Sequence, residues 1–273
     1  MQDRTAFCGG SDAAAILGLS PWKSRLQLWA EKSGIVKDTK ENPAMEWGTR
    51  LEAVIFDKFK EQHRELQVFG GWQFVHPEYH FIVGHVDGTI IDKLATEDAV
   101  LEIKTANAYS GREWETGVPT YYLCQVQHYM AVTGWLKCYV AVLIGGQDYR
   151  EYIILRDDAF IEKMIAEEVK FWEEVQTGTP PLSESAEDAE ILALLTPTTE
   201  GKTVDLPEDA DWLIGMRTGI QAAISENQEQ LKTINVKLQE MLGDAEVGRT
   251  PKHEIRWRKS GKGRTLAIKE MAE

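Results

Sequence analysis

Three charged side chains interrupt two stretches of the chain that are otherwise strongly apolar. Asp87 lies in the first stretch, and Glu102 and Lys104 lie in the second. Because strand side chains repeat every two residues, Glu102 and Lys104 share one face of a strand. Two carboxylates on adjacent strands can hold Mg²⁺ through oxygen ligands. A lysine beside them can position an attacking water or stabilise charge on a phosphate. The alternative is that Glu102 and Lys104 lie on the solvated face of an edge strand. A Glu-x-Lys sequence taken alone favours this alternative.

Two predicted helices add candidates for the same site. Glu52 falls on the apolar face of a helix over Ala44–His63, where a carboxylate is costly unless a cation or hydrogen bonds satisfy it. Gly48, one turn earlier, would let another backbone approach. Gln125 lies on a helix over Tyr121–Thr133 and could orient water or a phosphate oxygen. A satisfied core amide is the alternative interpretation of Gln125.

The N-terminal region predicts an anion site. Ser11 is expected to cap a short helix, and Ser20 a second one with Pro21 at its first position. Free amides at helix N-termini bind phosphate, and Lys23 and Arg25 add positive charge. The four candidate phosphate contacts are therefore Ser11, Ser20, Lys23 and Arg25. Ordinary capping explains the two serines equally well.

Helical and strand patterns both occur, so we expect a mixed α/β (α+β) fold. Besides the elements above, we expect a polar loop at Lys93–Asp98. The second N-terminal helix should end near Lys32, before Gly34. Further strands are predicted at Gln67–Phe69, Trp72–His76, Phe81–Asp92, Val100–Lys104, Cys138–Ile144 and Tyr149–Leu155, and a further helix at Asp157–Gln176. The predicted domains are a core at 1–178 that carries the charged site, a linker with a short helix at 179–206, and an appended region at 207–273.

The appended region combines a heptad-patterned helix with a basic hairpin. A long helix is predicted over Asp209–Leu242, and a hairpin over His253–Ile268. Residues 249–269 hold eight Lys or Arg and one Glu, a local charge of +7 in a chain of net charge −14. This asymmetry favours an anionic partner, with a solubilising tail as the alternative. The heptad seam favours self-association or partner binding about as much as packing on its own domain. It comprises Ile220, Ile224, Asn227, Leu231, Ile234, Leu238 and Met241.

Composition limits the class of protein. The 273 residues are 43% hydrophobic, which is enough for a sizeable core. No apolar stretch approaches 18 residues, so no membrane span is expected. The first ten residues lack the layout of a signal peptide. The three cysteines have no CxxC spacing and are expected to be reduced thiols in a cytoplasmic protein.

The motifs together resemble the YqaJ-type viral recombinases, relatives of bacteriophage lambda exonuclease, over about residues 8–156. The resemblance implies a PD-(D/E)xK nuclease with a restriction-endonuclease-like fold, in which a central mixed sheet is flanked by helices. The matching segments, in the family's order and spacing, are Gly9-Gly10-Ser11-Asp12, Ile16-Leu17-Gly18-Leu19-Ser20-Pro21-Trp22-Lys23-Ser24, Leu28-Trp29, Trp47-Gly48 with Glu52, His85-Val86-Asp87-Gly88, Leu101-Glu102-Ile103-Lys104 and Gln125-Val126-Gln127-His128-Tyr129.

The resemblance also assigns roles. Asp87, Glu102 and the Ile103 carbonyl would bind Mg²⁺, with Mn²⁺ as a substitute. Glu52 would assist at the metal centre and Lys104 would be the catalytic lysine. Gln125 would complete the active site.

The implied activity is a 5′→3′ exonuclease on linear double-stranded DNA in a bacterial host cell, encoded by a phage or prophage. It would leave 3′ single-stranded tails for recombination, beside a single-strand annealing protein. A trimer is implied by lambda exonuclease. The alternatives are an endonuclease or nickase on the same core, and a non-enzymatic DNA-binding assembly protein.

Overall fold

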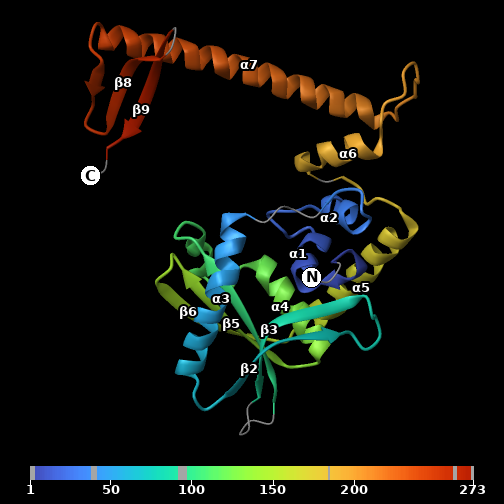
Figure 1. The fold of residues 1–273 in the computed structure, drawn as a ribbon. Coiled ribbons are helices and arrows are strands. Elements are labelled where there is room, and N and C mark those ends of the chain that lie inside the picture. The colour runs from blue at the N-terminus through green and yellow to red at the C-terminus, as the bar shows by residue number, and fades with distance from the viewer. Residues whose placement is uncertain (1–3, 38–41, 92–96, 184, 261–262, 272–273) are drawn as a thin grey trace. The chain divides into compact units, whose positions relative to one another are not determined.

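The computed structural model describes residues 4–37, 42–91, 97–183, 185–260 and 263–271. It divides into two compact units, Met1–Pro197 and Thr198–Glu273 (Figure 1). The short helix predicted inside a linker belongs to the first unit, because Ile191 of that helix is buried in a cluster with Trp29 and Phe171. Of the predicted loop Lys93–Asp98, residues 93–96 lie outside the described residues.

A six-stranded mixed sheet forms the centre of the first unit. Its order is β1-β3-β4-β5-β6, and β2 pairs with β3. The β1–β3 and β4–β5 pairs are parallel, and the other pairs are antiparallel. The strands are β1 (Cys8–Gly9), β2 (Gln67–Val75), β3 (Ile82–Ile91), β4 (Ala99–Ala106), β5 (Lys137–Ile144) and β6 (Asp148–Leu155).

Helices cover both faces of this sheet, as the burial of consecutive residues in the central strands requires. Val140 of β5 packs in the cluster with α1, α4 and α5, whereas Ala141 packs in the cluster with α3. A strand buried on both faces is a near-continuous apolar run, which is how β5 is written. The helices are α1 (Gly10–Ile16), α2 (Arg25–Lys32), α3 (Pro43–Gln62), α4 (Thr120–Thr133), α5 (Asp158–Thr177) and α6 (Ala189–Leu195), with 3₁₀ turns at Arg4–Ala6, Ser110–Trp114 and Ala186–Asp188. The expected fold, a mixed sheet flanked by helices, is confirmed.

The two predicted N-terminal helix starts are wrong. Helix α1 begins at Gly10 with Gly9 as its N-cap, because the Asp12 carboxylate accepts a hydrogen bond from the Gly9 amide at 2.9 Å. Ser11 therefore lies inside the first turn.

Helix α2 begins at Arg25, and Ser24 is its cap. Ser24 Oγ accepts from the Gln27 amide at 3.0 Å, and Gln27 Oε1 accepts from the Ser24 amide at 3.2 Å. This reciprocal pair outcompetes Ser20 for the helix start. Ser20 and Pro21 lie in the preceding turn. There, Ser20 Oγ accepts hydrogen bonds from the backbone amides of Trp22 and Lys23.

Strand β2 is continuous, although Gly70-Gly71 had suggested two separate strands. The register pairs Gly70 with Gly88 and Trp72 with Val86, so Gly71 lies opposite Asp87. A Cβ at Gly71 would stand 2.4 Å from the Val86 carbonyl oxygen. Glycine is needed here because β2 approaches β3 closely beside the first candidate carboxylate.

The second unit contains a long helix and a small sheet. Helix α7 spans Asp209–Leu242, as predicted, and its heptad seam is largely exposed. The basic hairpin is formed by β8 (His253–Ser260) and β9 (Gly263–Glu270). A third strand, β7 (Val247–Arg249), pairs with β8 and was not predicted. Within the predicted hairpin His253–Ile268, residues 261–262 lie outside the described residues.

Two expectations from composition can be compared with these elements. No helix in the described ranges is both long and apolar enough to cross a membrane. Cys8, Cys124 and Cys138 are free and buried.

Candidate active site

The predicted carboxylates meet where β3 and β4 part. The paired residues of the two strands run from Ile90 with Ala99 to Gly88 with Leu101. Asp87 and Glu102 are the next residues along each strand. Asp87 Oδ2 accepts a hydrogen bond from the Ile103 amide at 2.7 Å, so a carboxylate bridges the strands at this point.

Glu102 is the centre of a buried polar network. Its exposed fraction is 1%. Its Oε1 accepts hydrogen bonds from Lys104 Nζ and from Gln125 Nε2, the latter at 2.8 Å. Gln125 Nε2 also donates to Tyr129 Oη at 2.8 Å. Glu102 Oε2 has no hydrogen-bond partner within the described part of the chain.

Burial sets the electrostatics of this network. Burial raises the pKa of the Glu102 carboxyl to about 8, the charge of Asp87 adds to the rise, and Lys104 opposes it. Burial alone would lower the pKa of Lys104, but Glu102 and Asp87 outweigh it and the net direction is upward. Lys104 therefore stays an ammonium beside two acids.

Glu52 joins this site from α3. Partial burial and the charge of Asp87 raise the pKa of the Glu52 carboxyl, and Lys104 opposes the rise. The residue is exposed overall, so the expected apolar surroundings are wrong. The expected approach of another backbone to Gly48 is wrong as well. The atom that a Cβ at Gly48 would meet is the Thr105 hydroxyl, a side-chain group, at 3.4 Å.

The donor set fits a hard divalent cation. Glu102 Oε2 is a buried carboxylate oxygen that no described residue hydrogen-bonds, and such an oxygen is costly unless a cation satisfies it. The available ligands are the carboxylates of Asp87 and Glu102 and the Ile103 carbonyl, all oxygens of the kind that Mg²⁺ prefers. Among the residues that the structure describes, no group of three or more His, Cys, Asp or Glu side chains could hold a metal ion by itself.

Two tyrosines of the site were not assigned roles from the sequence. Tyr129 receives the Gln125 hydrogen bond, and Lys104 Nζ lies 5.0 Å from the centre of the Tyr122 ring. The spacing of Gln125 and Tyr129, one helical turn, could have paired them. Tyr122 lies 18 positions from Lys104 in the sequence, and no local pattern connects the two.

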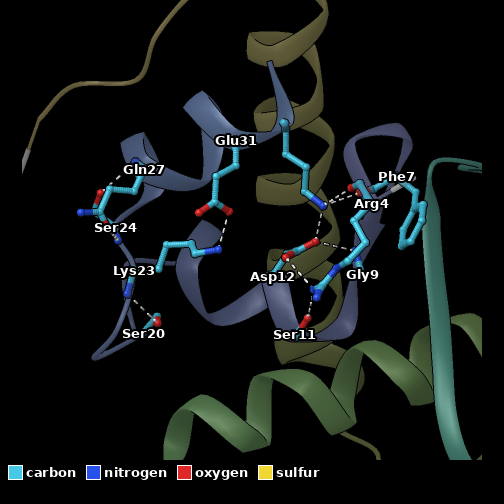
Figure 2. A network of polar contacts seen from close by, with 11 residues as sticks. Arg4, Phe7, Gly9, Ser11, Asp12, Ser20, Lys23, Ser24, Gln27 and Glu31 are labelled. Atoms are coloured by element: carbon cyan, nitrogen blue, oxygen red, sulfur yellow. Dashed lines mark hydrogen bonds and ion pairs between the residues drawn. The ribbon is translucent and has the colours of Figure 1, made fainter. Parts of the chain in front are cut away.

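The predicted anion site is only partly assembled (Figure 2). Ser11 Oγ accepts a hydrogen bond from Arg4 Nη2 at 2.9 Å, and the same nitrogen lies 3.9 Å from Asp12 Oδ1. The Arg4 side chain is 51% exposed. Behind them, Lys32 Nζ lies 2.6 Å from Asp12 Oδ2 in a buried ion pair. Lys32 also donates to the carbonyls of Arg4 and Phe7, both at 2.7 Å. This network fixes Arg4 beside Ser11, a contact the sequence did not predict.

Ser20, Lys23 and Arg25 lie elsewhere and do not join Ser11. Lys23 pairs with Glu31. Arg25 Nη1 lies 2.9 Å from Glu167, and its Nη2 lies 3.1 Å from Glu174. These cations already neutralise acids of the fold, so their predicted role as phosphate ligands loses its electrostatic basis.

A cavity of about 280 Å³ beside Ser20 does not restore that role. It is lined by Lys23 and Arg25 but also by Glu187 and Asp188. The buried Asp188 accepts a hydrogen bond from Ser24. The acids disfavour a phosphate there.

Sequence comparison identifies the family. The profile of the YqaJ-like viral recombinase domain matches residues 1–135. The YqaJ protein of Bacillus subtilis (strain 168) is 35% identical over 268 residues, which cover 94% of this chain and 81% of that protein. The chain belongs to the YqaJ-like family. Protein D345L of African swine fever virus (strain Badajoz 1971 Vero-adapted) is 30% identical over 151 residues, 48% of this chain and 44% of that protein.

Solved structures agree with this family assignment at the level of the fold. The alkaline exonuclease LHK-Exo of Laribacter hongkongensis is 23% identical, with a TM-score of 0.55 over 71% of this chain and 96% of that chain. LHK-Exo in complex with dAMP is 25% identical, with a TM-score of 0.56 over 64% of this chain and 91% of that chain. The YqaJ-like chain thus has an exonuclease fold, and the resemblance in its motifs is confirmed.

Proposed function

We propose that this chain is a Mg²⁺-dependent exonuclease that degrades linear double-stranded DNA from the 5′ end. The observation that carries the proposal is the buried Glu102, next to Asp87 and Lys104. One of its carboxylate oxygens has no hydrogen-bond partner among the residues that the structure describes. Phosphodiester hydrolysis builds negative charge that must be stabilised. A metal-dependent nuclease therefore needs carboxylates that hold a cation and an ammonium group beside them. Family membership supports the proposal independently.

Each side chain has a separable role in this proposal. Asp87, Glu102 and the Ile103 carbonyl would hold Mg²⁺, which when bound neutralises phosphate charge and activates water. Lys104 would hold the attacking water or a phosphate oxygen with its ammonium group. Gln125 fixes the orientation of Glu102 through the 2.8 Å hydrogen bond.

Glu52 would act as a proton acceptor at the edge of this site. The residue as a whole is exposed, and the pKa that partial burial and Asp87 raise makes its carboxylate a better base than an ordinary glutamate. It lies near enough to Asp87 and Lys104 to respond to both charges.

The catalytic assignment is tested by Lys104→Met and Asp87→Asn. We expect each variant to lose at least about 10²-fold in the rate of Mg²⁺-dependent degradation of linear duplex. Lys137→Met is a matched control, because Lys137 is also a strand lysine lying over a tyrosine, at 5.7 Å from the Tyr139 ring. Closed circular duplex should survive, and EDTA should stop the reaction.

Other outcomes lead to the alternatives. Rapid cutting of the closed circle would favour an endonuclease or nickase. Binding without any metal-dependent cleavage would favour a DNA-binding assembly protein. Near-normal degradation by both variants would remove the active site proposed here.

End recognition is assigned to Arg4 and Ser11. The half-exposed Arg4 guanidinium lies 3.9 Å from Asp12, but that carboxylate is already paired with Lys32 at 2.6 Å, so a positive charge remains at Arg4. Together with the Ser11 hydroxyl, Arg4 could bind a 5′-phosphate, which carries more charge than an internal diester. Arg4→Ala should reduce the preference for 5′-phosphorylated over 5′-hydroxyl ends. Lys23→Ala should leave that preference unchanged, because Lys23 pairs with Glu31. Equal degradation of both ends by the unmodified protein would exclude a phosphate site.

The proposed role of the enzyme in recombination concerns its product, its partner protein and its oligomeric state. The 3′ single-stranded tails left by 5′→3′ degradation would pass to a single-strand annealing protein. A homo-oligomer, a trimer by the family resemblance, would keep the enzyme on one duplex. Native electrophoresis of the digestion products, with strand-specific labels, distinguishes 3′ tails from 5′ tails.

A further inference from the structure

The small sheet of the second unit has two chemically different faces. Residues paired across antiparallel strands project to the same side, so the register assigns each side chain to a face. Arg256 is paired with Val247 and Ala267, and Arg258 is paired with Thr265. On the same face, Glu254 is paired with Arg249 and Lys269. We call the four cations Arg249, Arg256, Arg258 and Lys269 the basic face.

The middle of the opposite face is apolar and partly covered, between the pair His253 and Glu270 at one end and the pair Lys259 and Arg264 at the other. Ile255 is buried and is paired with Ile268, and Trp257 is paired with Leu266. At the same end of the unit, the last residue of α7, Leu242, is also buried. A Cβ at Gly248 of β7 would stand 2.6 Å from the Leu242 side chain, so glycine is required for β7 to lie against it. The sheet and the end of α7 thus form one packed module that leaves the basic face outward.

The carboxylates near the basic face organise its cations but do not cancel them. Glu254 accepts from Arg249 Nε at 3.1 Å and from Arg256 Nε at 2.5 Å. Glu246 pairs with Arg258 at 2.7 Å. Hydrogen bonds from Arg256 and Arg249 lower the pKa of the Glu254 carboxyl, so it stays ionised. Two carboxylates against four cations leave a positive excess.

This arrangement suits a polyanion with a regular backbone. Exposed ion pairs contribute little energy, so a guanidinium can exchange its carboxylate for a phosphate at small cost. Arginine binds phosphate oxygens through two parallel hydrogen bonds. Arg256 and Arg258 are two residues apart on one strand, about 7 Å. The other outward residues of the strands, Val247, Thr265 and Ala267, are small and leave the guanidinium groups accessible.

We propose that the basic face binds the phosphate backbone of DNA outside the active site, without reading its sequence. The inference extends the proposed function, since it gives the nuclease a second hold on its substrate. Phosphate contacts position a protein on DNA but carry no sequence information. Such a hold would slow dissociation of the enzyme between successive cleavage steps.

The test measures binding separately from cleavage. The full chain is mixed with a labelled duplex in EDTA, and fluorescence anisotropy gives the dissociation constant at several salt concentrations. Arg256→Ala/Arg258→Ala should weaken binding and reduce the salt slope by about two, since each lost phosphate contact removes about 0.9. Arg217→Ala/Lys232→Ala removes the same charge from exposed positions on α7 and should leave the slope nearly unchanged.

A double variant that conserves the charge controls for misfolding. Arg256→Lys/Arg258→Lys should retain most of the binding and most of the slope. Equal losses in the sheet and helix double variants would overturn the inference, because they would indicate a general charge effect. An unchanged slope in Arg256→Ala/Arg258→Ala would overturn it as well. Absence of nuclease activity would count against the proposed function alone, since EDTA excludes cleavage from this assay.

A different observation concerns Trp22, in the turn before α2. Its side chain is 65% exposed, and its backbone amide donates to Ser20 Oγ at 3.2 Å. Its ring meets Tyr121 edge-on at 4.5 Å and lies 6.0 Å from the ring of Tyr122. Tyr122 in turn lies 5.0 Å from Lys104 Nζ. The exposed Trp22 ring thus packs on two tyrosines, and one of them, Tyr122, also contacts the proposed catalytic lysine.

The geometry points to Trp22 as a stacking surface for an unpaired nucleobase next to the cleaved nucleotide. This inference also rests on the proposed function. Stacking of a base on an aromatic side chain contributes about 1–3 kcal/mol and needs no particular base. Trp22 would therefore position the strand without selecting its sequence.

Trp22→Ala should weaken binding of a single-stranded oligonucleotide in EDTA by about tenfold, as that stacking energy implies. In cleavage, it should raise KM more than it lowers kcat, and Trp22→Phe should restore most of the loss. Trp72→Ala is the matched control, because Trp72 of β2 is also 65% exposed. An equal loss in Trp72→Ala, or normal binding by Trp22→Ala, would overturn the assignment. Cleavage absent from all variants would count against the proposed function, and the binding arm would still decide the role of Trp22.

Discussion

Glu102 is held where its own charge is disfavoured. It is almost fully buried, Lys104 and Gln125 bond to one of its oxygens, and the other oxygen has no partner among the described residues. Burial raises the pKa of this carboxyl to about 8, with Asp87 adding to the rise. A bound cation would offset both effects. The site should therefore respond to Mg²⁺ in stability as well as in activity.

We expect Mg²⁺ to raise the free energy of unfolding of the first unit, by about 1.4 kcal/mol at ten times its dissociation constant. Tryptophan fluorescence can follow this unit, because seven of the nine tryptophans lie in residues 1–197. Asp87→Asn should lose the response. Asp148→Asn, which removes an exposed carboxylate paired with Arg150, should keep it. The same Mg²⁺ effect in both variants would argue against a metal site at Asp87.

Charged residues inside apolar strands are what made this site predictable. Asp87, Glu102 and Lys104 interrupt runs that otherwise belong to a core, and the structure brings all three together. The serine caps failed because several residues in each turn can accept the same amide hydrogens. At α2, Ser24 and Gln27 form a reciprocal pair that Ser20 does not offer. The contact between Arg4 and Ser11 depends on a buried lysine from α2, which no local pattern specifies.

At the scale of elements, helix α4 is tied to its neighbours by a buried ion pair. His128 Nδ1 lies 2.8 Å from Glu168 Oε1 of α5, and Nε2 lies 3.1 Å from the Val83 carbonyl of β3. Both neighbours are acceptors, so a protonated imidazole satisfies both contacts. Since α4 also carries Gln125, this pair helps to place Gln125 against Glu102.

The stability of the first unit should therefore fall as pH rises above about 6.5. Burial lowers the pKa of His128, but the charge and hydrogen bond of Glu168 outweigh it and the net direction is upward. A raised folded pKa means that the folded state keeps its proton longer, so this contribution is complete below 6.5 and is lost through the folded pKa. The slope can reach about 1.4 kcal/mol per pH unit.

Urea unfolding at several pH values checks this expectation. The difference between the unmodified chain and His128→Gln isolates the pair from other titrating groups, among them His76, whose pKa burial lowers. The comparison should stay below pH 8, because two buried thiols titrate above that range. Burial raises the pKa of Cys8 and Cys124, so these thiols also make the stability depend on pH there. A pH-independent difference would mean that His128 is neutral in the folded chain.

Most elements could be predicted because their patterns agree with their surroundings. The bounds of α7 match the prediction, and β4 to β6 differ by no more than two residues at either end. Glycine gave the main error, since Gly70-Gly71 normally breaks a strand. Here the close approach of β2 to Asp87 needs glycine, which is a property of the tertiary structure. Strand β7 was missed because three residues carry too little alternation.

On the scale of the whole molecule, the chain joins an exonuclease-like core to a second unit. The core ends at Pro197, beyond α6, because Asp188 bonds to Ser24 and Ile191 is buried against the core. The second unit holds the heptad seam and the basic face. Catalytic candidates and association candidates thus belong to different units, and they can be altered separately.

The seam of α7 should drive self-association of the full chain. Ile224 is 51% exposed, and the neighbouring seam residues are exposed as well, so no described residue of its own unit covers the apolar stripe. The positions flanking the seam include Gln221, Gln228 and Gln230, which are uncharged and would not repel an identical helix. Leucine at Leu231 and isoleucine at Ile234, three positions later, favour bundles of three or four helices over pairs.

Light scattering coupled to gel filtration measures the outcome. Ile224→Asp should shift the full chain toward the monomer, since a buried carboxylate at the seam is costly. Val236→Asp places the same charge at an equally exposed position, 51%, away from the seam, and should leave the assembly intact. A chain ending at Pro197 should lose any association that depends on α7. If the unmodified chain is monomeric, or if both aspartate variants dissociate alike, the heptad pattern does not mediate assembly and the exposed stripe must serve a different partner.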